Sequence, residues 1–442
     1  MFANIIEANE LGQNFRDYIV VDIRRSDHFL GYEKQGVKGH IMGAINFPIE
    51  WIPYINVEKK LSFAQQKGID FTKKILIYDS DRNRLNQFIE YFSEYISIDI
   101  FFRLSNLKEY YDLYAENFYI FPGYQFIVSP EWVMDLINEE SPDTYDGKGY
   151  LIFDANSIVN DGEIEGEVHS YYQQFENEHL PQATLLDISQ IEDETLLNIR
   201  SFDEIKNYIE FKGISKDITV IVYSNSITAS YRAAFILYWA GVDKIRILDG
   251  GIKLWKQLGY PIESGPSKEN KKGVFEREFP LHDDKVIITG KEIYAKQHKS
   301  KLKLVSIRAW EEHVGDISGY ELLDSLSDEI VVGEPEGSIW GYCGRRIKKM
   351  DDYYSPDGRL RSPYEIASIW KKQGINQNDP IAFYCGTGWR ACTPLFMTFI
   401  LGWEHTYLYD GCWIEWSRDD SLPNRVEPSC KLVKPDSYND YQ

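Results

Sequence analysis

Hydrophobic and polar positions follow each other along this chain in a pattern that occurs three times. In each copy, a short apolar run ends on a polar or charged residue, and a loop, a second apolar run and an amphipathic segment follow. The first and second runs of the three copies are Tyr18–Arg24 and Ile75–Tyr78, Tyr150–Asp154 and Thr219–Tyr223, and Leu302–Arg308 and Pro380–Tyr384. Continuous apolar strands that alternate with amphipathic helices predict parallel sheets flanked by helices on both faces.

A third apolar run and a small loop complete each copy. The third runs are Ser97–Arg103, Lys244–Asp249 and His405–Asp410. The helix after the second run is clearest at Tyr231–Ala240 and Ala391–Leu401. Between the first two runs, an H-x-x-x-A loop stands at His40–Ala44 and His179–Ala183, and the third copy keeps only Glu334–Ser338. The sequence therefore predicts one α/β unit repeated in tandem.

The boundaries between these units are predicted in polar or turn-rich segments. Glu263–Gly273 is rich in Gly, Ser and Lys, as linkers between domains are. Phe121–Gly123 lies just before Val128–Asn138, whose Ser-Pro start is typical of a helix N-terminus. We therefore predict three domains, at residues 1–123, 124–266 and 274–442.

Composition and charge exclude several classes of partner. The chain has 442 residues, of which 43% are hydrophobic and 26% charged, as in a soluble globular protein. Its formal net charge of −21 would repel nucleic acid and anionic lipid, so we expect neither nucleic acid nor membrane as a partner. No apolar run approaches the ~20 residues that cross a bilayer. The N-terminal stretch does not read as a signal peptide, so we expect a cytoplasmic protein unless a leader has been removed.

The number and spacing of the cysteines also agree with a cytoplasmic protein. The five cysteines form no C-x-x-C pair and all lie in the last quarter of the chain, at Cys343, Cys385, Cys392, Cys412 and Cys430. This pattern argues against a disulfide framework and favours a reducing compartment. The eight histidines are scattered and form no cluster with cysteine, so we expect no metal site.

The loop after the second strand carries the candidate chemistry, because ligands of open α/β sheets bind beyond the carboxyl ends of the strands. The residue that follows the terminal Tyr of this strand is Asp79 in the first copy, Ser224 in the second and Cys385 in the third. Only the third is a strong nucleophile. Asp79 and Ser224 therefore predict that the first two domains are inactive.

The third loop is predicted to form an anion-binding cup around a reactive thiol. Its two glycines allow successive N–H groups to point inward, and the following helix adds the positive end of its dipole. A thiol in such a cup should have a lowered pKa and be largely thiolate at neutral pH. The site needs neither a metal ion nor an organic cofactor. We predict Cys385 as the catalytic residue, and as its substrate-binding cradle Gly386, Thr387, Gly388, Trp389 and Arg390.

The three copies resemble rhodanese homology domains. That family has D-x-R after the first strand, H-x-x-G-A before the second, a cysteine loop, and a DGG-type turn followed by Trp. The corresponding residues here are Asp22 and Arg24, His40–Ala44, Cys385–Arg390, Asp249–Gly251 with Trp255, and Asp410–Trp413 with Trp416. The layout is similar to that of the three-domain thiosulfate sulfurtransferases whose loop reads C-G-T-G-W-R and whose last domain alone is active.

The resemblance implies a sulfurtransferase. The Cys385 thiolate would take the outer sulfur of thiosulfate or a similar donor, and the persulfide would pass it to a thiol or a cyanide-like acceptor. Two alternatives keep the persulfide: a 3-mercaptopyruvate sulfurtransferase, and a sulfur carrier that serves a protein acceptor. A third alternative is a binding scaffold whose inactive domains recognise a partner. A cysteine phosphatase is disfavoured, since those enzymes have Cys-x5-Arg and this loop has Cys-x4-Arg.

The third copy departs from the family pattern at two positions. Ser306 stands where D-x-R would place Asp, so the support for Arg308 and for the loop behind it is expected to differ. Glu312 stands where two-domain thiosulfate enzymes have an additional Arg, and its charge is expected to repel thiosulfate.

Several further residues have two interpretations. Arg345 and Arg346, in the long segment Gly341–Leu360 of the third copy, are either a solvated charge run or a means of steering anions into the cleft. Trp389 is either a wall of the substrate site or a packed aromatic side chain. Cys392 is predicted to lie in the core, and a resolving thiol at Cys392 or Cys412 is the less favoured hypothesis.

Overall fold

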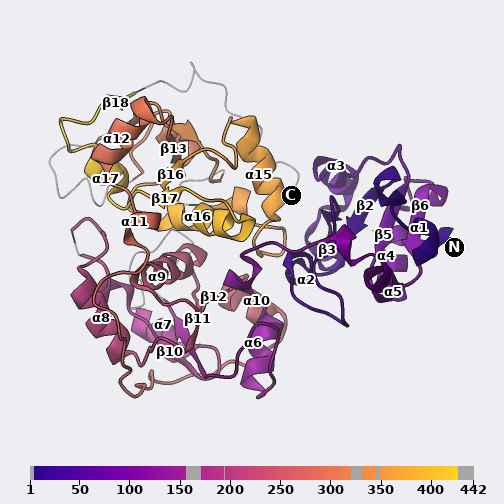
Figure 1. Ribbon diagram of the computed structural model, residues 1–442, viewed down its shortest axis with the longest axis horizontal. Helices are drawn as coiled ribbons and strands as arrows, with labels where there is room; N and C mark the ends of the chain where they lie inside the picture. The colour runs from indigo at the N-terminus through magenta and orange to yellow at the C-terminus, as the bar shows by residue number, and fades with distance from the viewer. Residues whose placement is uncertain (1–3, 156–170, 194, 320–330, 345–348, 427–442) are drawn as a thin grey trace. The chain divides into compact units, whose positions relative to one another are not determined.

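The computed structural model describes residues 4–155, 171–193, 195–319, 331–344 and 349–426. Within these residues lie three parallel sheets with helices packed against them (Figure 1). The α/β fold class predicted from the sequence is confirmed. The backbone divides into two compact units, of which the first contains residues 4–125 and 354–365 and the second contains the rest of the described chain.

The first unit is built on one five-stranded sheet. Its strands, all parallel, run in the order β1 (Asn4–Ile6), β6 (Phe101–Leu104), β5 (Ile75–Tyr78), β2 (Ile19–Asp22) and β4 (Ile45–Asn46). The accompanying helices are α1 (Ala8–Leu11), α2 (Ser26–Leu30), α3 (Lys60–Gln66), α4 (Arg82–Phe92) and α5 (Leu107–Leu113). An antiparallel pair joins β3 (His40–Ile41) to β7 (Phe118–Tyr119). The apolar side chains of β2 and β5 pack with Phe88 and Phe92 of α4 to form the core.

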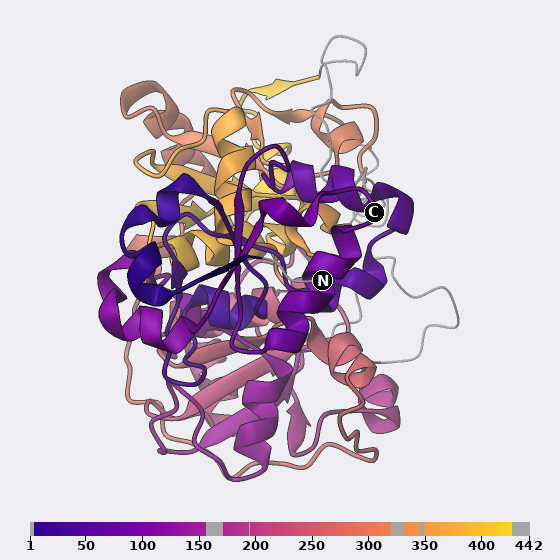
Figure 2. The ribbon, with the colours of Figure 1, turned by 90° about the vertical axis from the view of Figure 1, so that its right-hand side faces the viewer.

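The second unit contains the other two parallel sheets. One has the order β10 (Ala183–Leu185), β9 (Tyr150–Asp154), β11 (Thr219–Tyr223), β12 (Ile245–Leu248) and β8 (Ile127–Val128), and its pink strands run side by side in Figure 2. The other has the order β15 (Ile339–Trp340), β13 (Lys303–Ser306), β16 (Ile381–Tyr384) and β17 (Thr406–Leu408). An antiparallel pair joins β14 (Glu334–Pro335) to β18 (Asn424–Arg425).

Two long apolar helices of the second unit lie side by side between these sheets. They are α9 (Ile227–Ala240), which follows β11, and α16 (Trp389–Leu401), which follows β16 (Figure 1). Both helices are buried on nearly all sides because each packs on its own sheet and on the other helix. Each begins at the loop that the sequence marks as the candidate site, so the pairing brings the second and third copies together at that point.

Shorter helices surround the two sheets, and their ends follow local capping rules. Ser129 accepts a hydrogen bond from the backbone N–H of Trp132, and Pro130 occupies the first turn, where a missing N–H costs little. Thr289 and Glu292 form a capping box. These helices are α6 (Pro130–Ile137), α7 (Tyr171–Asn177), α8 (Phe202–Phe211), α10 (Gly251–Gln257), α11 (Asp283–Val286), α12 (Gly290–Lys299), α13 (Trp310–His313) and α17 (Cys412–Trp416). None of the described helices has the length and apolarity to cross a membrane.

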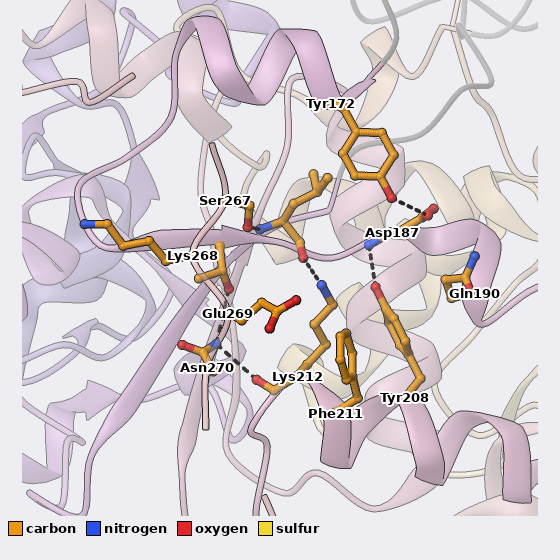
Figure 3. Close-up of a pocket in the computed structure, with 12 residues that line it drawn as sticks. Tyr172, Asp187, Gln190, Tyr208, Phe211, Lys212, Ser267, Lys268, Glu269 and Asn270 are labelled. Atoms are coloured by element: carbon orange, nitrogen blue, oxygen red, sulfur yellow. Dashed lines mark hydrogen bonds between the residues drawn. The ribbon is translucent and has the colours of Figure 1, made fainter. Parts of the chain in front are cut away.

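The segment predicted as a linker, Glu263–Gly273, is hydrogen-bonded along the edge of the second sheet. The Ser267 hydroxyl accepts the N–H of Leu185 at 2.9 Å, and the Asn270 amide donates to Lys212 O at 3.0 Å. The segment forms one wall of a pocket of about 500 Å³. Figure 3 shows the Lys212 ammonium group in this pocket beside Tyr208, donating to the carbonyl of Leu185. No residue of the Cys385 loop lines the pocket.

Residues 354–365, which include the last part of the long segment Gly341–Leu360, belong to the first unit. The Tyr364 ring packs edge-on against His40, with a hydrogen bond of 3.2 Å between the Tyr hydroxyl and the imidazole Nε2. Glu365 forms a 2.6 Å ion pair with Lys67, and burial lowers the pKa of that lysine to about 8 despite the carboxylate beside it. The first sheet domain therefore anchors a segment that the chain inserts between β15 and β16. Helix α15 (Pro363–Lys372) continues from this segment into the second unit.

Candidate active site

Cys385 lies directly after β16, at the carboxyl end of the third sheet. The loop Cys385–Gly388 leads into α16, and Gly388 has φ of 89°, a left-handed conformation that favours glycine. A Cβ atom at Gly388 would come within 2.9 Å of Arg232 Nη1. Glycine is thus required here both for the turn and for the close approach of the second copy. The Cys385 residue itself is 1% exposed.

The electrostatic environment favours the thiolate of Cys385. Burial by itself raises the pKa of the thiol, because a charge loses its hydration. The Cys412 side chain opposes this with a hydrogen bond, Arg390 opposes it with its positive charge, and the backbone N–H groups of Thr387 and Ala391 donate to the sulfur. These contributions outweigh burial and lower the pKa of Cys385 below its ordinary value. A buried thiolate surrounded by donors has the properties of a nucleophile.

Cys412 contacts Cys385 from the turn after β17. Its sulfur accepts the N–H of Cys385 at 3.3 Å and lies 2.9 Å from Tyr409 O. Its backbone has φ of 50°, which is unusual for a residue with a side chain and costs about 1–3 kcal/mol. In the second copy the same position is Gly251, with φ of 56°, where a Cβ would lie 2.6 Å from Ser224 O. A side chain at this position must therefore point at the residue in the nucleophile position.

The backbone of α17 also fixes the loop. Trp413 N–H donates to Cys385 O at 3.0 Å, and Ile414 N–H donates to Gly386 O at 3.3 Å. The first N–H groups of a helix have no partner within it, so they are free to bind these loop carbonyls. The loop is thereby held at the carboxyl end of β16 with its own N–H groups left for the sulfur.

Arg390 forms an ion pair with Glu312. Its Nη1 and Nη2 bind the two Glu312 oxygens at 2.8 and 3.0 Å, and Nη1 is 3.8 Å from Cys343 Sγ. Burial tends to raise the pKa of Glu312, but Arg390 and Arg308 outweigh it and keep the pKa low. The expected repulsion by Glu312 is therefore largely neutralised, and Arg390 has little charge left for a dianion.

Trp389 is bound to the second copy. It is 7% exposed, and its indole N–H donates to Glu192 Oε1 at 3.0 Å. Arg232 of α9 also binds Glu192 and forms a 2.7 Å ion pair with Asp410 in the turn before Cys412. Burial raises the pKa of Glu192 to about 7 despite the pairing with Arg232. These contacts favour the packed interpretation of Trp389 over that of a substrate wall.

A buried carboxylate holds the Tyr that ends the central strand in the first two sheets. Tyr78 donates to Asp22 Oδ2 at 2.8 Å and accepts the N–H of Ile41 at 3.1 Å. In the second sheet Tyr223 is bound to Asp154 in the same manner. The Asp of the first strand and the H-x-x-x-A loop thus meet at the tyrosine that precedes the nucleophile position.

In the third sheet a buried acid also binds the tyrosine that ends the central strand, but this acid lies on β14 instead of the first strand. Glu334 accepts hydrogen bonds from the Tyr384 hydroxyl and, at 2.8 Å, from Ser306. Its carboxylate also lies 3.4 Å from Arg308 and 3.2 Å from His313 Nδ1. Burial would raise the pKa of Glu334, but these partners keep it lowered. Ser306 and Glu334 together therefore replace the Asp of the first two copies.

The structure brings together most of the predicted site. Gly386, Thr387 and Gly388 follow Cys385 in its loop, whereas the side chains of Trp389 and Arg390 are bound to Glu192 and Glu312. Cys392 is buried with its thiol bonded to Gly388 O and its pKa raised by burial. Arg345, Arg346 and Cys430 lie outside the described residues. In the first two copies, Asp79 is paired with Arg84 at 2.7 Å, and Ser224 accepts the N–H of Ser226. Across the described part of the chain, no three His, Cys, Asp or Glu side chains are placed to hold a metal ion.

Three functional residues were not identified from the sequence: Glu192, Arg232 and Glu334. Glu192 and Arg232 belong to no motif, because their roles arise only where α9 packs on α16. Glu334 had a signal, since an acid appears in the H-x-x-x-A position of the one copy that lacks Asp in its first strand. The loss of the Asp at Ser306 and the gain of an acid at Glu334 together predict that one residue compensates for the other.

Comparison with known proteins identifies the family. The rhodanese-like domain model matches residues 129–258 and 289–419, which together make up more than half of the chain. The chain belongs to the rhodanese-like domain family.

Relatives with assigned names give the class of activity. Thiosulfate sulfurtransferase YnjE of Escherichia coli (strain K12) is 28% identical over 413 residues, 91% of this chain and 88% of the relative. The crystal structure of YnjE matches with a TM-score of 0.82 at 26% identity, covering 97% of both chains. Human 3-mercaptopyruvate sulfurtransferase is 25% identical over 55% of this chain and 78% of its own. This chain is a sulfurtransferase enzyme of the rhodanese type.

A further structural relative acts on a different kind of compound. It is the anaerobic ergothioneine biosynthesis enzyme of Chlorobium limicola, solved with its natural substrate trimethyl histidine. The structures match with a TM-score of 0.84 at 25% identity, covering 97% of this chain and all of that one.

Replacing Cys412 by Ala should raise the pKa of Cys385 by at least ~1 unit, since the largest contribution that lowers it is removed. The thiolate exists above the pKa, so the pH midpoint of iodoacetamide alkylation moves upward. Alkylation of the whole protein, followed by intact mass at each pH, measures this midpoint. Cys392→Ala, which removes a thiol from the adjacent helix, is the control and should leave the midpoint unchanged. An unchanged midpoint in Cys412→Ala would contradict the assignment.

Replacing Glu334 by Gln should lower the free energy of unfolding by about 1–3 kcal/mol at pH 7, because Arg308 loses one of its two buried carboxylate partners and keeps only Glu312. The pKa of Glu334 is lowered in the folded state, so its contribution is present above the unfolded value and is lost as the pH falls through the folded one. Urea denaturation at pH 7 and in acid measures both effects. The exposed neighbour Glu336→Gln is the control; equal losses in the two variants would refute the buried role.

Proposed function

We propose that this enzyme transfers sulfane sulfur through a persulfide on Cys385, with thiosulfate or a similar donor. The observation that carries this proposal is the place of Cys385 in the loop between β16 and α16, in contact with Cys412 and with N–H groups of the loop that lower the pKa of its thiol. In the first step the thiolate attacks the outer sulfur of thiosulfate. The S–S bond of the donor breaks, sulfite leaves with the electron pair, and the Cys385 persulfide forms.

In the second step an acceptor, a thiolate or cyanide, attacks the terminal sulfur of the persulfide. The bond between that sulfur and Cys385 breaks, and the cysteine thiolate is regenerated. The same N–H groups of Thr387 and Ala391 that favour the thiolate would stabilise the negative charge in both steps. Proton transfer to the sulfur is not required in either step.

We propose that one of the three copies, the third, carries the reaction. The positions equivalent to Cys385 hold Asp79 in the first copy and Ser224 in the second. The second copy serves as a positioning element through Arg232 and Glu192. The first copy holds residues 354–365 by the buried pair of Lys67 and Glu365. We propose for the three copies the domain limits predicted from the sequence, at residues 1–123, 124–266 and 274–442.

The pairing of Arg390 with Glu312 favours a second candidate donor. A guanidinium that binds a carboxylate bidentately has little charge to offer a dianion such as thiosulfate. A donor of lower charge, such as 3-mercaptopyruvate or the persulfide of a protein, fits this site better in electrostatic terms. The relatives named as 3-mercaptopyruvate sulfurtransferases agree with this candidate.

Incubation of the wild type with thiosulfate should add one sulfur atom to the intact mass, located on Cys385 by peptide mapping. Cys385→Ser should lose the addition and all sulfur transfer, while Ser224→Ala and Cys392→Ser should keep both. A parallel incubation with 3-mercaptopyruvate ranks the donors, and release of the sulfur to cyanide, a thiol or trimethyl histidine ranks the acceptors. Full transfer activity in Cys385→Ser would overturn the proposal.

Replacing Glu312 by Gln should free the charge of Arg390 and increase kcat/KM for thiosulfate about tenfold relative to that for 3-mercaptopyruvate. The gain should appear mainly in KM, since the charge acts on donor binding. Steady-state kinetics with both donors measure the ratio, and thermal unfolding checks that the variant is folded. Glu311→Gln, next in the sequence, is the control. A ratio that does not move in the folded variant would exclude Glu312 as a determinant of donor choice.

A further inference from the structure

A pocket of about 250 Å³ occupies, in the first sheet domain, the place that the thiol loop occupies in the third. It is lined by the residues that follow three neighbouring strands: Arg24 after β2, Asp79 and Ser80 after β5, and Ser105 and Asn106 after β6. The carboxyl ends of adjacent parallel strands are where open α/β sheets bind their ligands. The first copy has lost the nucleophile but has kept a pocket.

The charges that line this pocket are mostly positive. Arg24, Lys34, Arg82 and Lys108 contribute four cations, and Asp79 is the one acidic residue in the lining. Asp79 is bound by Arg84 at 2.7 Å, so its charge is largely compensated. Arg24 and Lys108 are paired with Asp22 and Asp112 in turn, so the uncompensated positive charge of the lining comes from Lys34 and Arg82.

Some of these cations have no partner in the part of the chain that the structure describes. Lys34 and Arg82 are exposed and form no ion pair there, whereas Lys108 pairs with Asp112. The free side chains lie on two different elements, the Lys34–Val37 turn and the start of α4. They can approach a ligand from both sides of the pocket.

Arg24 supplies the most specific observation. It is 4% exposed, and its Nε and Nη2 bind Asp22, with a further bond from Nη2 to Gly39 O. Its Nη1 is buried and has no hydrogen-bond partner among the described residues. Buried donors of folded proteins are nearly always satisfied, and Arg24 is one of the residues that line the basic pocket, so its unsatisfied donor is consistent with an acceptor from outside the chain.

We propose that this pocket binds a small tetrahedral oxyanion with two negative charges. The ligand is either a free inorganic anion or the phosphoryl group of a small phosphate monoester, both of which present the same oxygens to Arg24, Lys34 and Arg82. The site lies in the first unit and does not involve Cys385, so it is separate from the proposed sulfur transfer. It gives the inactive first copy a binding role.

The test uses the full-length protein and selenate, which is tetrahedral, doubly charged and not a sulfur donor. Calorimetric titration at constant ionic strength should show saturable binding to the wild type. Lys34→Glu with Arg82→Glu should weaken it about tenfold or more. The control variant, Arg16→Glu with Lys73→Glu, has the same net charge as the test variant. Both of its substituted residues are exposed, and they precede β2 and β5, so they lie at the end of the sheet opposite the pocket. This control should bind as the wild type does.

Two further measurements decide the outcome. Selenate-soaked crystals of the wild type should give an anomalous peak of selenium beside Arg24, a readout independent of any variant. Titration with glycerol phosphate in place of selenate distinguishes a phosphate monoester from a free anion as the better ligand. Equal affinity of both double variants would overturn the proposal, as would a selenium peak at the Cys385 loop alone or loss of selenate binding in Cys385→Ser.

Discussion

The position of the Cys385 sulfur depends on a buried carboxylate, that of Glu334. A charge inside a protein is stable only when other groups replace its hydration, and Glu334 has Arg308, His313, Ser306 and Tyr384 around it. Tyr384 is the last residue of β16, and Cys385 follows it directly. Hydrogen bonds and ion pairs to Glu334 therefore connect β13, the segment Glu334–Ser338 and the loop that begins at Cys385.

The buried acid that binds the tyrosine before the nucleophile position has a different environment in each copy. In the first sheet, Asp22 has Arg24 as its partner and remains an ion pair. In the second, no basic partner of Asp154 lies among the residues that the structure describes, and burial raises its pKa to about 8. The third copy moves the acid to Glu334 and retains Arg308 beside it. The geometry around the Tyr is common to all three, while the charge state of the acid is not.

The thiolate of Cys385 is favoured first by the hydrogen bond of the Cys412 side chain, then by the charge of Arg390, and then by N–H groups of the loop. Arg390 lowers the pKa of Cys385, but its guanidinium is held by Glu312. The more specific contributions come from N–H groups of the loop and from Cys412, whose left-handed backbone directs its side chain at the thiol. The second copy supports this arrangement, because Arg232 fixes the turn that carries Cys412 through Asp410.

The sequence determined the repeated strands, the cysteine loop and the class of chemistry, because these depend on the order of residues within short segments. Strands β5, β9 and β11 have the predicted limits, and Cys385 lies where the repeat places it. Only the tertiary structure decided which charges meet. Arg390 binds Glu312, 78 positions away in sequence, and Trp389 binds Glu192, 197 positions away. A pairing of this kind depends on how sheets and helices pack, and packing brings together residues whose spacing in the chain carries no signal.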